Sequence, residues 1–485
     1  MPLRLEPAVR KEANSRYETA RLFSNACLRT ALDRTEALKA DPEWGMACRL
    51  KQGPQKTKAF RDLRISHQFS ERELMTAASA FRVGFLREKI GAQEAQVLGR
   101  RMYQAVNKWL VGRGGKPRYK GKSRGLHSLE CKDMNGDLRV AKDARGLQWG
   151  RDLLIPFALD RPDPCQVYAL EQVKAGKLLY CRIVRTKVKS RWAYRGQLIM
   201  AGTPLSKYEV GNQKVGLDLG PSKIAIVSDK IAVKETLGAG LKDASQELRR
   251  LQRRLDRQHR FGSAGCFDAQ GRHVPGGCEW KARSRRAKQT QEQMADLWRR
   301  LSEHRKSLHG NLANRILAQG VDVKAEKLSY ASLQKNYGRS VNRRAPGGFF
   351  EILSRKAASA GGQMTEINTY TTALSQTCVC GRQAKKKLSQ RRHDCPQCKL
   401  KTDRDILPAF LTRHVDTSGV THRLVFSTAR LELLSRHDID GWSESGLKNA
   451  RVPAATRLVG QGETPWSASA ISSRITADAH VGEAA

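Results

Sequence analysis

Three acidic residues occupy positions where an unpaired charge would be costly. Asp218 lies inside the apolar run Val-Gly-Leu-Asp-Leu-Gly, and Glu326 ends the strand-like run that begins at Val321. Asp405 opens a segment, Asp-Ile-Leu-Pro-Ala-Phe-Leu, whose apolar residues favour a buried helix. Burying a charge without a partner costs several kcal/mol, so each acid needs a cation, an arginine or a chemical role.

Three carboxylates that converge from the ends of separate elements would form a metal site. They could hold two Mg²⁺ ions about 3.5–4 Å apart, one to activate a water and one to stabilise the leaving 3′ oxygen of a phosphodiester. Mg²⁺ keeps several waters, so a few carboxylates suffice as ligands. Each acid taken alone is explained as well by a surface or capping position. The order of the three acids in a strongly basic chain favours a shared site.

The cysteines indicate a second metal site. Cys378-x-Cys380 and Cys395-x-x-Cys398 place four thiolates in one short segment, which matches tetrahedral structural Zn²⁺. Such a site stabilises a segment with too little apolar content to fold alone. The first pair is one residue tighter than the usual Cys-x-x-Cys, so His393 is an alternative fourth ligand. Four unrelated buried cysteines are the other explanation.

The charge of the chain indicates a polyanionic partner. Its 485 residues carry 89 Lys and Arg against 47 Asp and Glu, a net charge of +42. Such an excess repels itself unless a polyanion neutralises it, and each phosphate contacted on a nucleic acid releases condensed counterions. Basic residues run through every region of the chain, which favours nucleic acid over the alternatives, a ribosomal-type or a membrane-surface basic protein.

Membrane-spanning and secreted proteins fit the sequence poorly. No window of about 18 apolar residues would span a membrane, and the N-terminus lacks the apolar stretch of a signal peptide. The eleven cysteines are scattered except for one group, which indicates reduced thiols and a metal site rather than a disulfide framework. We expect a cytoplasmic protein with no membrane partner.

Two basic segments are candidate nucleic-acid contacts. A glycine-rich loop, residues 112–125, surrounds one aromatic ring with cations and would bind phosphates while the ring stacks on a base. A helical stretch over 242–260 carries arginines beside an apolar stripe of leucines. The candidate residues are Lys116, Arg118, Tyr119, Lys120, Lys122 and Arg124 in the loop, and Arg249, Arg250, Arg253 and Arg254 in the helix. A solvated helix face explains any single arginine equally well.

The predicted secondary structure that positions these residues changes along the chain, from helices to a β domain and then to an α/β unit. Apolar spacings of three or four predict helices over 11–38 and 71–111, and short alternating runs within 126–207 predict a small antiparallel β domain. From 213 onward the pattern predicts an α/β unit. Its predicted elements are strands around 215–219, 224–227, 321–326 and 363–369, basic helices over 242–260 and 280–319, and helices at 348–360 and after Asp405. After 415 no motif is evident, and the last 40 residues, rich in Ser, Ala, Gly and Thr, are expected to be a mobile tail.

In this order the motifs resemble those of the transposon-encoded TnpB proteins and their relatives, the miniature type V CRISPR effector nucleases. VGLDLG is similar to the first RuvC motif, VDVKAEKLSY to the second, and DCPQC followed by DRD to the second zinc knuckle and the third RuvC motif. The resemblance covers most of residues 1–415 and is strongest from 213 onward. It implies that the catalytic acids are Asp218, Glu326 and Asp405, the second Asp of DRD.

The resemblance also implies a fold and a division into domains. The fold is an α/β RNase H-like (RuvC) nuclease domain with a zinc-knuckle insert, together with an N-terminal β wedge domain and a helical recognition lobe. The wedge would comprise residues 1–10 and 126–207, the recognition lobe 11–125, the nuclease domain 208–377 and 399–415, the zinc knuckle 378–398, and a largely disordered C-terminal extension 416–485.

The function implied by the resemblance is RNA-guided DNA cleavage in a prokaryotic cytoplasm, as part of antiviral defence. A guide RNA would pair with target double-stranded DNA beside a short flanking motif, and the Mg²⁺ site would hydrolyse phosphodiesters. The family usually continues DRDxNAA, whereas Leu407-Pro408-Ala409 stands here in place of Asn-Ala-Ala. The acid is kept, but the helix that supports it is altered.

Several alternatives stay open. The altered residues after Asp405 favour RNA-guided DNA binding with weak or no cleavage. A transposon-encoded TnpB nuclease fits the same motifs. A guide-independent RNase H-fold enzyme, such as a junction resolvase or strand transferase, is disfavoured by the large basic region before Asp218. The sequence leaves monomer and homodimer equally open.

Overall fold

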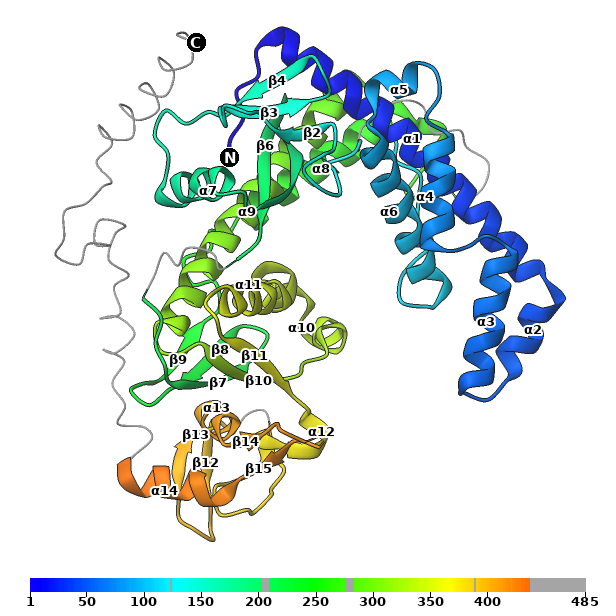
Figure 1. Ribbon diagram of the computed structural model, residues 1–485. Helices are drawn as coiled ribbons and strands as arrows, with labels where there is room; N and C mark the ends of the chain where they lie inside the picture. The colour runs from blue at the N-terminus through cyan, green and yellow to red at the C-terminus, as the bar shows by residue number, and fades with distance from the viewer. Residues whose placement is uncertain are drawn as a thin grey trace. The chain divides into compact units, whose positions relative to one another are not determined.

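The chain forms two compact units (Figure 1). The computed structural model describes residues 1–122, 124–189, 191–202, 209–274, 283–387, 390–419 and 421–436. Unit 1 comprises Met1–Leu205 with Leu255–Asp296, and unit 2 comprises Ser206–Arg254 with Leu297–Ala485. The boundary near residue 206 lies close to the predicted start of the nuclease domain, whereas 255–296 associates with unit 1.

Unit 1 begins with a long helix, α1 (Pro7–Ala40). Pro7 occupies the first helical position, where its missing N–H costs nothing. Side chains at spacings of three or four, among them Tyr17, Phe23 and Cys27, are buried on one face of the helix. Because the helix starts at Pro7, residues 7–10, which the resemblance assigns to the β wedge, are helical.

The predicted helix over 71–111 is three shorter helices. The chain breaks at Gly84, whose φ of +53° favours glycine, and α4 packs against α6 at Gly99. An added Cβ at Gly99 would lie 2.6 Å from the carbonyl oxygen of Leu74. Two further helices occupy 42–66, where the sequence pattern predicts none. The helices after α1 are α2 (Pro42–Arg49), α3 (Pro54–Ser66), α4 (Glu71–Ala80), α5 (Phe85–Lys89) and α6 (Ala92–Leu110).

The rest of unit 1 contains two small antiparallel sheets, as the alternating runs predict. One sheet has the order β1-β5-β6 and the other the order β2-β3-β4. Residues at the N-terminus join both: the N–H of Leu3 donates to Tyr194 O and that of Arg4 to Pro156 O. A helix that was not predicted, α7 (Pro164–Lys174), is capped by Asp163. The strands are β1 (Ser128–Glu130), β2 (Leu138–Val140), β3 (Gly146–Trp149), β4 (Leu153–Pro156), β5 (Leu178–Val188) and β6 (Arg191–Met200).

A buried acid links the helices of unit 1 to the second sheet. Glu94 in α6 is 2% exposed, and its carboxyl oxygens accept hydrogen bonds from Trp149 Nε1 at 2.9 Å and from the N–H of Gly91 at 2.8 Å. Burial raises the pKa of Glu94 to about 7 in spite of these two donors. The folded state therefore favours the protonated side chain.

Glu94→Gln should weaken a pH dependence of stability. Because the folded-state pKa of Glu94 lies above its usual value of 4.5, the folded state binds this proton more tightly than the unfolded chain does. The free energy of unfolding therefore falls as pH rises from about 4.5 to 7, by on the order of 3 kcal/mol from this group. Urea unfolding at both ends of that range should show a smaller difference for the variant than for the wild type. If the free energy of unfolding changed equally with pH in the variant and the wild type, Glu94 would not be the source of this pH dependence.

Unit 2 is built on a mixed five-stranded sheet with the order β11-β10-β7-β8-β9. The central strand β7 is antiparallel to β8 and parallel to β10, which in turn is parallel to β11. A meander of three strands followed by two parallel strands on the other side is the strand order of an RNase H-like sheet. The strands are β7 (Lys214–Leu219), β8 (Lys223–Val227), β9 (Ala232–Thr236), β10 (Asp322–Glu326) and β11 (Gln363–Ile367).

Helices cover both faces of this sheet. On one face, alternate residues such as Leu217 and Ala325 pack with side chains of α9 (Arg285–Leu317) and α11 (Pro346–Ser359). On the other face lies α13 (Ile406–Arg413), whose side chains pack with Ala225 and Val227 of β8. Two more helices of the chain are α8 (Ser245–Gly262) and α10 (Tyr330–Arg344).

The segment after 415 is ordered as far as the structure describes it. Strands β14 (Val415–Asp416) and β15 (Arg423–Leu424) pair, and helix α14 (Phe426–Arg436) follows. Ala429 of α14 is fully buried beside α13. The prediction of a largely disordered extension from 416 is therefore wrong for the described residues up to 436, and 437–485 lie outside the described residues. Within the part of the chain that the structure describes, no helix is both long and apolar enough to cross a membrane.

Candidate active site and metal centre

Asp218 and Glu326 lie side by side at the carboxyl ends of two parallel strands. Leu217 in β7 pairs with Ala325 in β10, so the next residue of each strand is one of the two acids. Leu217 and Ala325 face α9 and α11, and side chains alternate along a strand. Both acids therefore project from the opposite face, on which α13 lies. The ends of parallel strands are the usual place for a binding site in an α/β sheet.

Asp405 reaches the same place from the start of α13. It is the residue before the first turn of that helix. All three acids are half-buried. Burial raises the pKa of Asp218 to about 8, and the negative charges of Glu326 and Asp405 add to the effect. Burial also raises the pKa of Glu326, against a hydrogen bond from the backbone of Leu374. The structure thus brings the three predicted acids together.

The neighbouring acid, Asp403, has a different role. Its Oδ1 accepts the N–H groups of Asp405 at 2.8 Å and of Ile406 at 3.3 Å, and its Oδ2 pairs with Lys234. Asp403 therefore caps the start of α13 with one oxygen and binds a cation with the other. That Asp405, rather than Asp403, is the third site acid stays a prediction.

The donor set fits Mg²⁺. Carboxylate oxygens are the hard ligands that this ion prefers, and two or three of them suffice because the ion keeps its waters. Carboxyl groups of like charge that burial has already made basic gain most from a cation between them. The three acids meet both conditions.

The four predicted cysteines form one cluster. All four sulfur atoms lie within 4.8 Å of one another, with 3.5 Å between Cys378 and Cys398 and 3.6 Å between Cys380 and Cys395. The second pair lies at the turn between β12 (Arg392–Asp394) and β13 (Lys401–Asp403). Four thiolates at this separation could hold one tetrahedral Zn²⁺.

Cys378 and Cys380, which are separated by only one residue, lie at a turn that includes Gly381. Its φ is +90°, a conformation that favours glycine, and its N–H donates to Cys378 O. Burial raises the pKa of Cys395, but N–H groups of Cys398 and Gln397 donate to its sulfur and bring the pKa below its usual range. Among the described residues the cluster does not include His393, so the alternative fourth ligand is not needed.

The cluster lies within the segment that matches a known family. Residues 347–410 match the family model described as Cas12f1-like, TNB domain. This segment is similar to a Cas12f1-like TNB domain. The match includes the four cysteines and Asp405, and it confirms the resemblance to the miniature type V CRISPR effectors and TnpB proteins. The four-cysteine cluster and the strand order of unit 2 agree with a RuvC-type fold that carries a zinc knuckle.

Solved structures give weaker likenesses. The chain of a cryo-EM structure of a Cas12f1-sgRNA-target DNA complex is 12% identical, with a TM-score of 0.38, over 84% of this chain and 96% of that chain. The chain of a cryo-EM CRISPR-Cas12f ternary complex is 15% identical, with a TM-score of 0.27, over 83% and 82%. No curated protein matches the chain. Because both TM-scores are below 0.5, the assignment depends on the TNB match.

Helix α14, which the sequence pattern does not predict, contacts both the turn at Val379 and Cys380 and helix α13. Arg430 donates from Nε to Val379 O at 3.1 Å and from a terminal nitrogen to Cys380 O at 2.7 Å. Glu432 forms an ion pair with Arg413 at the end of α13, and its other oxygen lies 3.1 Å from Nε2 of His414. One helix therefore contacts both the cysteine cluster and the helix that begins after Asp405.

The basic loop of unit 1 is fixed at one point by α1. The side-chain oxygen of Asn25 accepts a hydrogen bond from the N–H of Lys120 at 2.9 Å, and the side-chain nitrogen of Asn25 donates to the carbonyl oxygen of Lys120 at 3.1 Å. Tyr119 next to it is 56% exposed, and Lys116 pairs with Glu36 at 3.2 Å. The backbone is thus held while the ring stays accessible, as a stacking residue requires.

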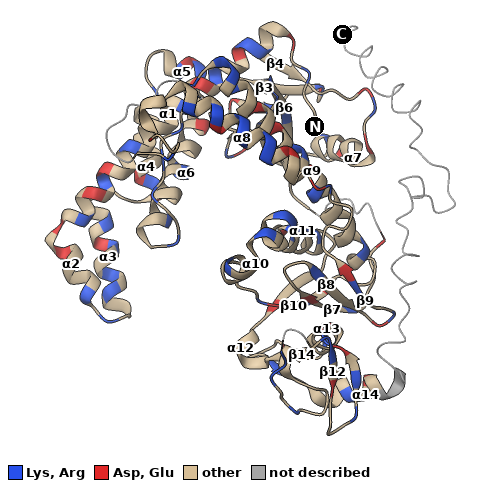
Figure 2. Ribbon diagram, turned by 180° about the vertical axis from the view of Figure 1, so that it is seen from behind, with Lys and Arg blue, Asp and Glu red and all other residues tan. Residues whose placement is uncertain are grey.

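The four predicted arginines of α8 are all exposed. Only Leu251 of this helix is buried, and Figure 2 shows the basic residues along it. The arginines are Arg249, Arg250, Arg253 and Arg254. Their role in binding nucleic acid, like that of the loop, stays a prediction.

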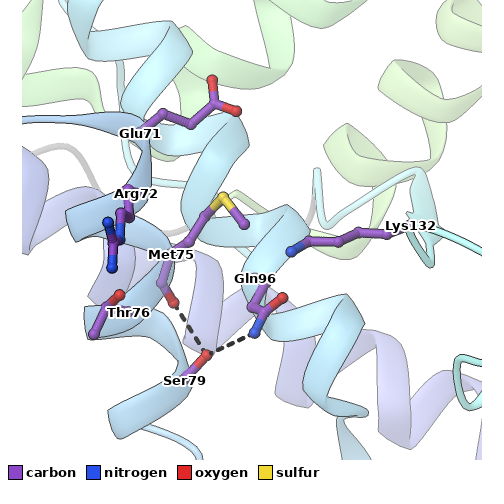
Figure 3. Close-up of a pocket in the computed structure, with 7 residues that line it drawn as sticks. All are labelled: Glu71, Arg72, Met75, Thr76, Ser79, Gln96 and Lys132. Atoms are coloured by element: carbon purple, nitrogen blue, oxygen red, sulfur yellow. Dashed lines mark hydrogen bonds between the residues drawn. The ribbon is translucent and has the colours of Figure 1, made fainter.

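A pocket of unit 1 lies apart from all of these residues. It has a volume of about 470 Å³ and is lined by α4 and α6 with Lys132 at its side (Figure 3). Across it Gln96 donates to Ser79 Oγ at 3.3 Å. None of the predicted site residues lines it. The candidate chemistry therefore lies at the strand ends of unit 2.

Cys395→Ser should abolish stoichiometric zinc binding. The wild type should carry one Zn²⁺ per chain, and the variant well below one, because a hydroxyl is a poor substitute for a thiolate ligand. Elemental analysis of the purified full-length chains measures this. Cys48→Ser, at an exposed cysteine in α2, is the matched control and should keep the ion. A folded wild type without zinc would refute the site.

Arg430→Met should loosen the zinc site without removing a ligand. The carbonyl groups of Val379 and Cys380 would lose their donor, and loss of such supporting contacts typically costs about 10- to 100-fold in metal affinity. The variant should therefore lose zinc to a chelator faster than the wild type does. Release at the wild-type rate would show that α14 does not support the knuckle.

Proposed function

We propose that the chain is an RNA-guided, Mg²⁺-dependent DNA endonuclease. The observation that carries the proposal is the convergence of Asp218, Glu326 and Asp405 on one face of an RNase H-like sheet, beside a Cas12f1-like TNB domain. The net charge of +42 supports a nucleic-acid partner.

The three acids would act together on one phosphodiester. Asp218 and Glu326 present carboxylates from adjacent strand ends, and Asp405 approaches from the start of α13. Bound between them, two Mg²⁺ ions would activate a water and stabilise the leaving oxygen. The protein fixes the three carboxylates before the substrate arrives, so little reorganisation remains for the reaction.

Guide and target would be held by basic surfaces of the two units. The loop with Tyr119 and the arginines of α8 offer cations to phosphates and a ring to a base. The guide RNA would supply sequence specificity by pairing with the target DNA, while the protein binds the shape of the duplex and a short flanking motif. In this proposal the β sheets of unit 1 form the wedge and its helices the recognition lobe.

RNA-guided binding without cutting is the second candidate, because Leu407-Pro408-Ala409 replaces the family's Asn-Ala-Ala. Pro408 lies in the first turn of α13, where a missing N–H is tolerated. Leu407 and Phe410 are fully buried, so the helix forms and packs. The replacement therefore keeps Asp405 in place, and this favours cleavage over simple occupancy.

Asp218→Ala and Glu326→Ala should each abolish guided cleavage and leave guided binding intact. Removing one metal ligand should lower the rate about 100-fold or more. The RNA that co-purifies with the chain is sequenced, a matched plasmid is built, and nicking and binding are measured with Mg²⁺. Asp322→Asn, at an exposed acid at the other end of β10, is the matched control and should cut normally.

The same experiment separates the alternatives. A wild type that binds the matched plasmid but never nicks it would favour target silencing. Cleavage that persists after all RNA has been removed would refute both guided functions and favour a guide-independent nuclease. Repeat arrays or transposon ends beside the coding sequence would distinguish a CRISPR effector from a TnpB nuclease.

A further inference from the structure

Lys234 lies in one row with Asp218 across the sheet. Asp218 pairs with Ala225 in β8, and Ala225 pairs with Lys234 in β9. Directly paired residues of neighbouring strands point to the same face, so Lys234 and Asp218 share the face that carries α13. Their Cα atoms are separated by two strand spacings, roughly 10 Å. The residue between them, Ala225, is buried in the cluster that contains side chains of α13.

The ammonium group of Lys234 bridges two carboxylates at this start. Its Nζ forms a short ion pair with Asp403 Oδ2 and lies 3.4 Å from Asp405 Oδ2. The other oxygen of Asp403 accepts the backbone N–H groups of Asp405 and Ile406. Lys234 and Asp403 therefore fix both the backbone of Asp405 and one oxygen of its side chain.

We propose that Lys234 is a positioning residue that holds Asp405 Oδ2 and leaves Oδ1 as the single oxygen that Asp405 offers to a metal ion. This inference rests on the proposed function of the three-acid site. An acid that offers one oxygen suits Mg²⁺, which requires near-octahedral geometry, whereas Ca²⁺ also accepts carboxylates through both oxygens. Lys234 thus biases the site toward the smaller ion.

Lys234→Met tests the inference in the full-length chain with its co-purified RNA. Mg²⁺ and Ca²⁺ are each titrated against bound Mn²⁺, followed by electron paramagnetic resonance. The ratio of Ca²⁺ to Mg²⁺ affinity should rise about tenfold or more, and Mg²⁺-supported cleavage should fall about 10- to 100-fold. Lys234→Arg keeps the positive charge, so this variant should have nearly the wild-type affinity ratio and nearly the wild-type rate of Mg²⁺-supported cleavage. Lys223→Met, at an exposed lysine of β8, is the matched control.

Asp403→Asn is a second variant in case Lys234→Met folds poorly. Asparagine keeps an oxygen for the two N–H groups but removes the ion pair with Lys234, so the affinity ratio should shift in the same direction. A wild-type affinity ratio in both variants would overturn the inference. Because ion binding is measured apart from cleavage, a wild type that binds ions but never cuts would refute the proposed cleavage while leaving this measurement decisive for Lys234.

Discussion

The close contact between α13 and β7 determines where the third acid lies. An added Cβ at Gly216 would lie 2.0 Å from the carbonyl oxygen of Ala409, so any other residue would push the helix away from the sheet. Gly216 is two residues before Asp218 and faces the same side of the sheet. With the helix seated at this point, its first turn brings Asp405 within electrostatic reach of Asp218. The geometry of the site therefore depends on a glycine, which has no side chain, at position 216.

Placing three carboxyl groups close together in a half-buried site destabilises the folded state, because their negative charges repel one another. Burial and the charges of its neighbours raise the pKa of Asp218 to about 8, so without a cation the site retains a proton near neutral pH. Charged groups around it reduce the repulsion: Arg404 lowers the pKa of Asp218, and Lys234 pairs with Asp403 and Asp405. A bound divalent ion would complete this compensation, which is why such a cluster is better explained by metal binding than by stability.

Local patterns were sufficient to predict part of this site. Asp218 is conspicuous as a charge within an alternating apolar strand, and the spacing of the four cysteines is a local property of the chain. The pairing of β7 with β10, which places Glu326 beside Asp218, depends on contacts between segments about a hundred residues apart. Lys234 looks like any polar residue of an edge strand, and its place beside the acids follows only from the pairing of β9 with β8 and of β8 with β7.

Helix α14 was missed for a related reason. Its contacts with the rest of unit 2 run through Arg430 and Glu432 as well as through the buried Ala429. Hydrogen bonds from a guanidinium group to distant carbonyl groups leave no trace in hydrophobic periodicity. The absence of a motif after 415 left this helix unpredicted, and both polar contacts and the buried Ala429 hold it in place.

The zinc knuckle and the third acid are linked through a short covalent path. Cys395 and Cys398 lie at the turn of the β12–β13 hairpin, β13 ends at Asp403, and Asp403 caps the helix that Asp405 begins. The knuckle segment has few apolar residues, so cross-linking by a metal ion at the four cysteines would stabilise its fold. A zinc ion that fixes the hairpin also fixes the direction in which β13 leaves it. A zinc ion bound by the four cysteines would therefore help to position Asp405 without contacting it.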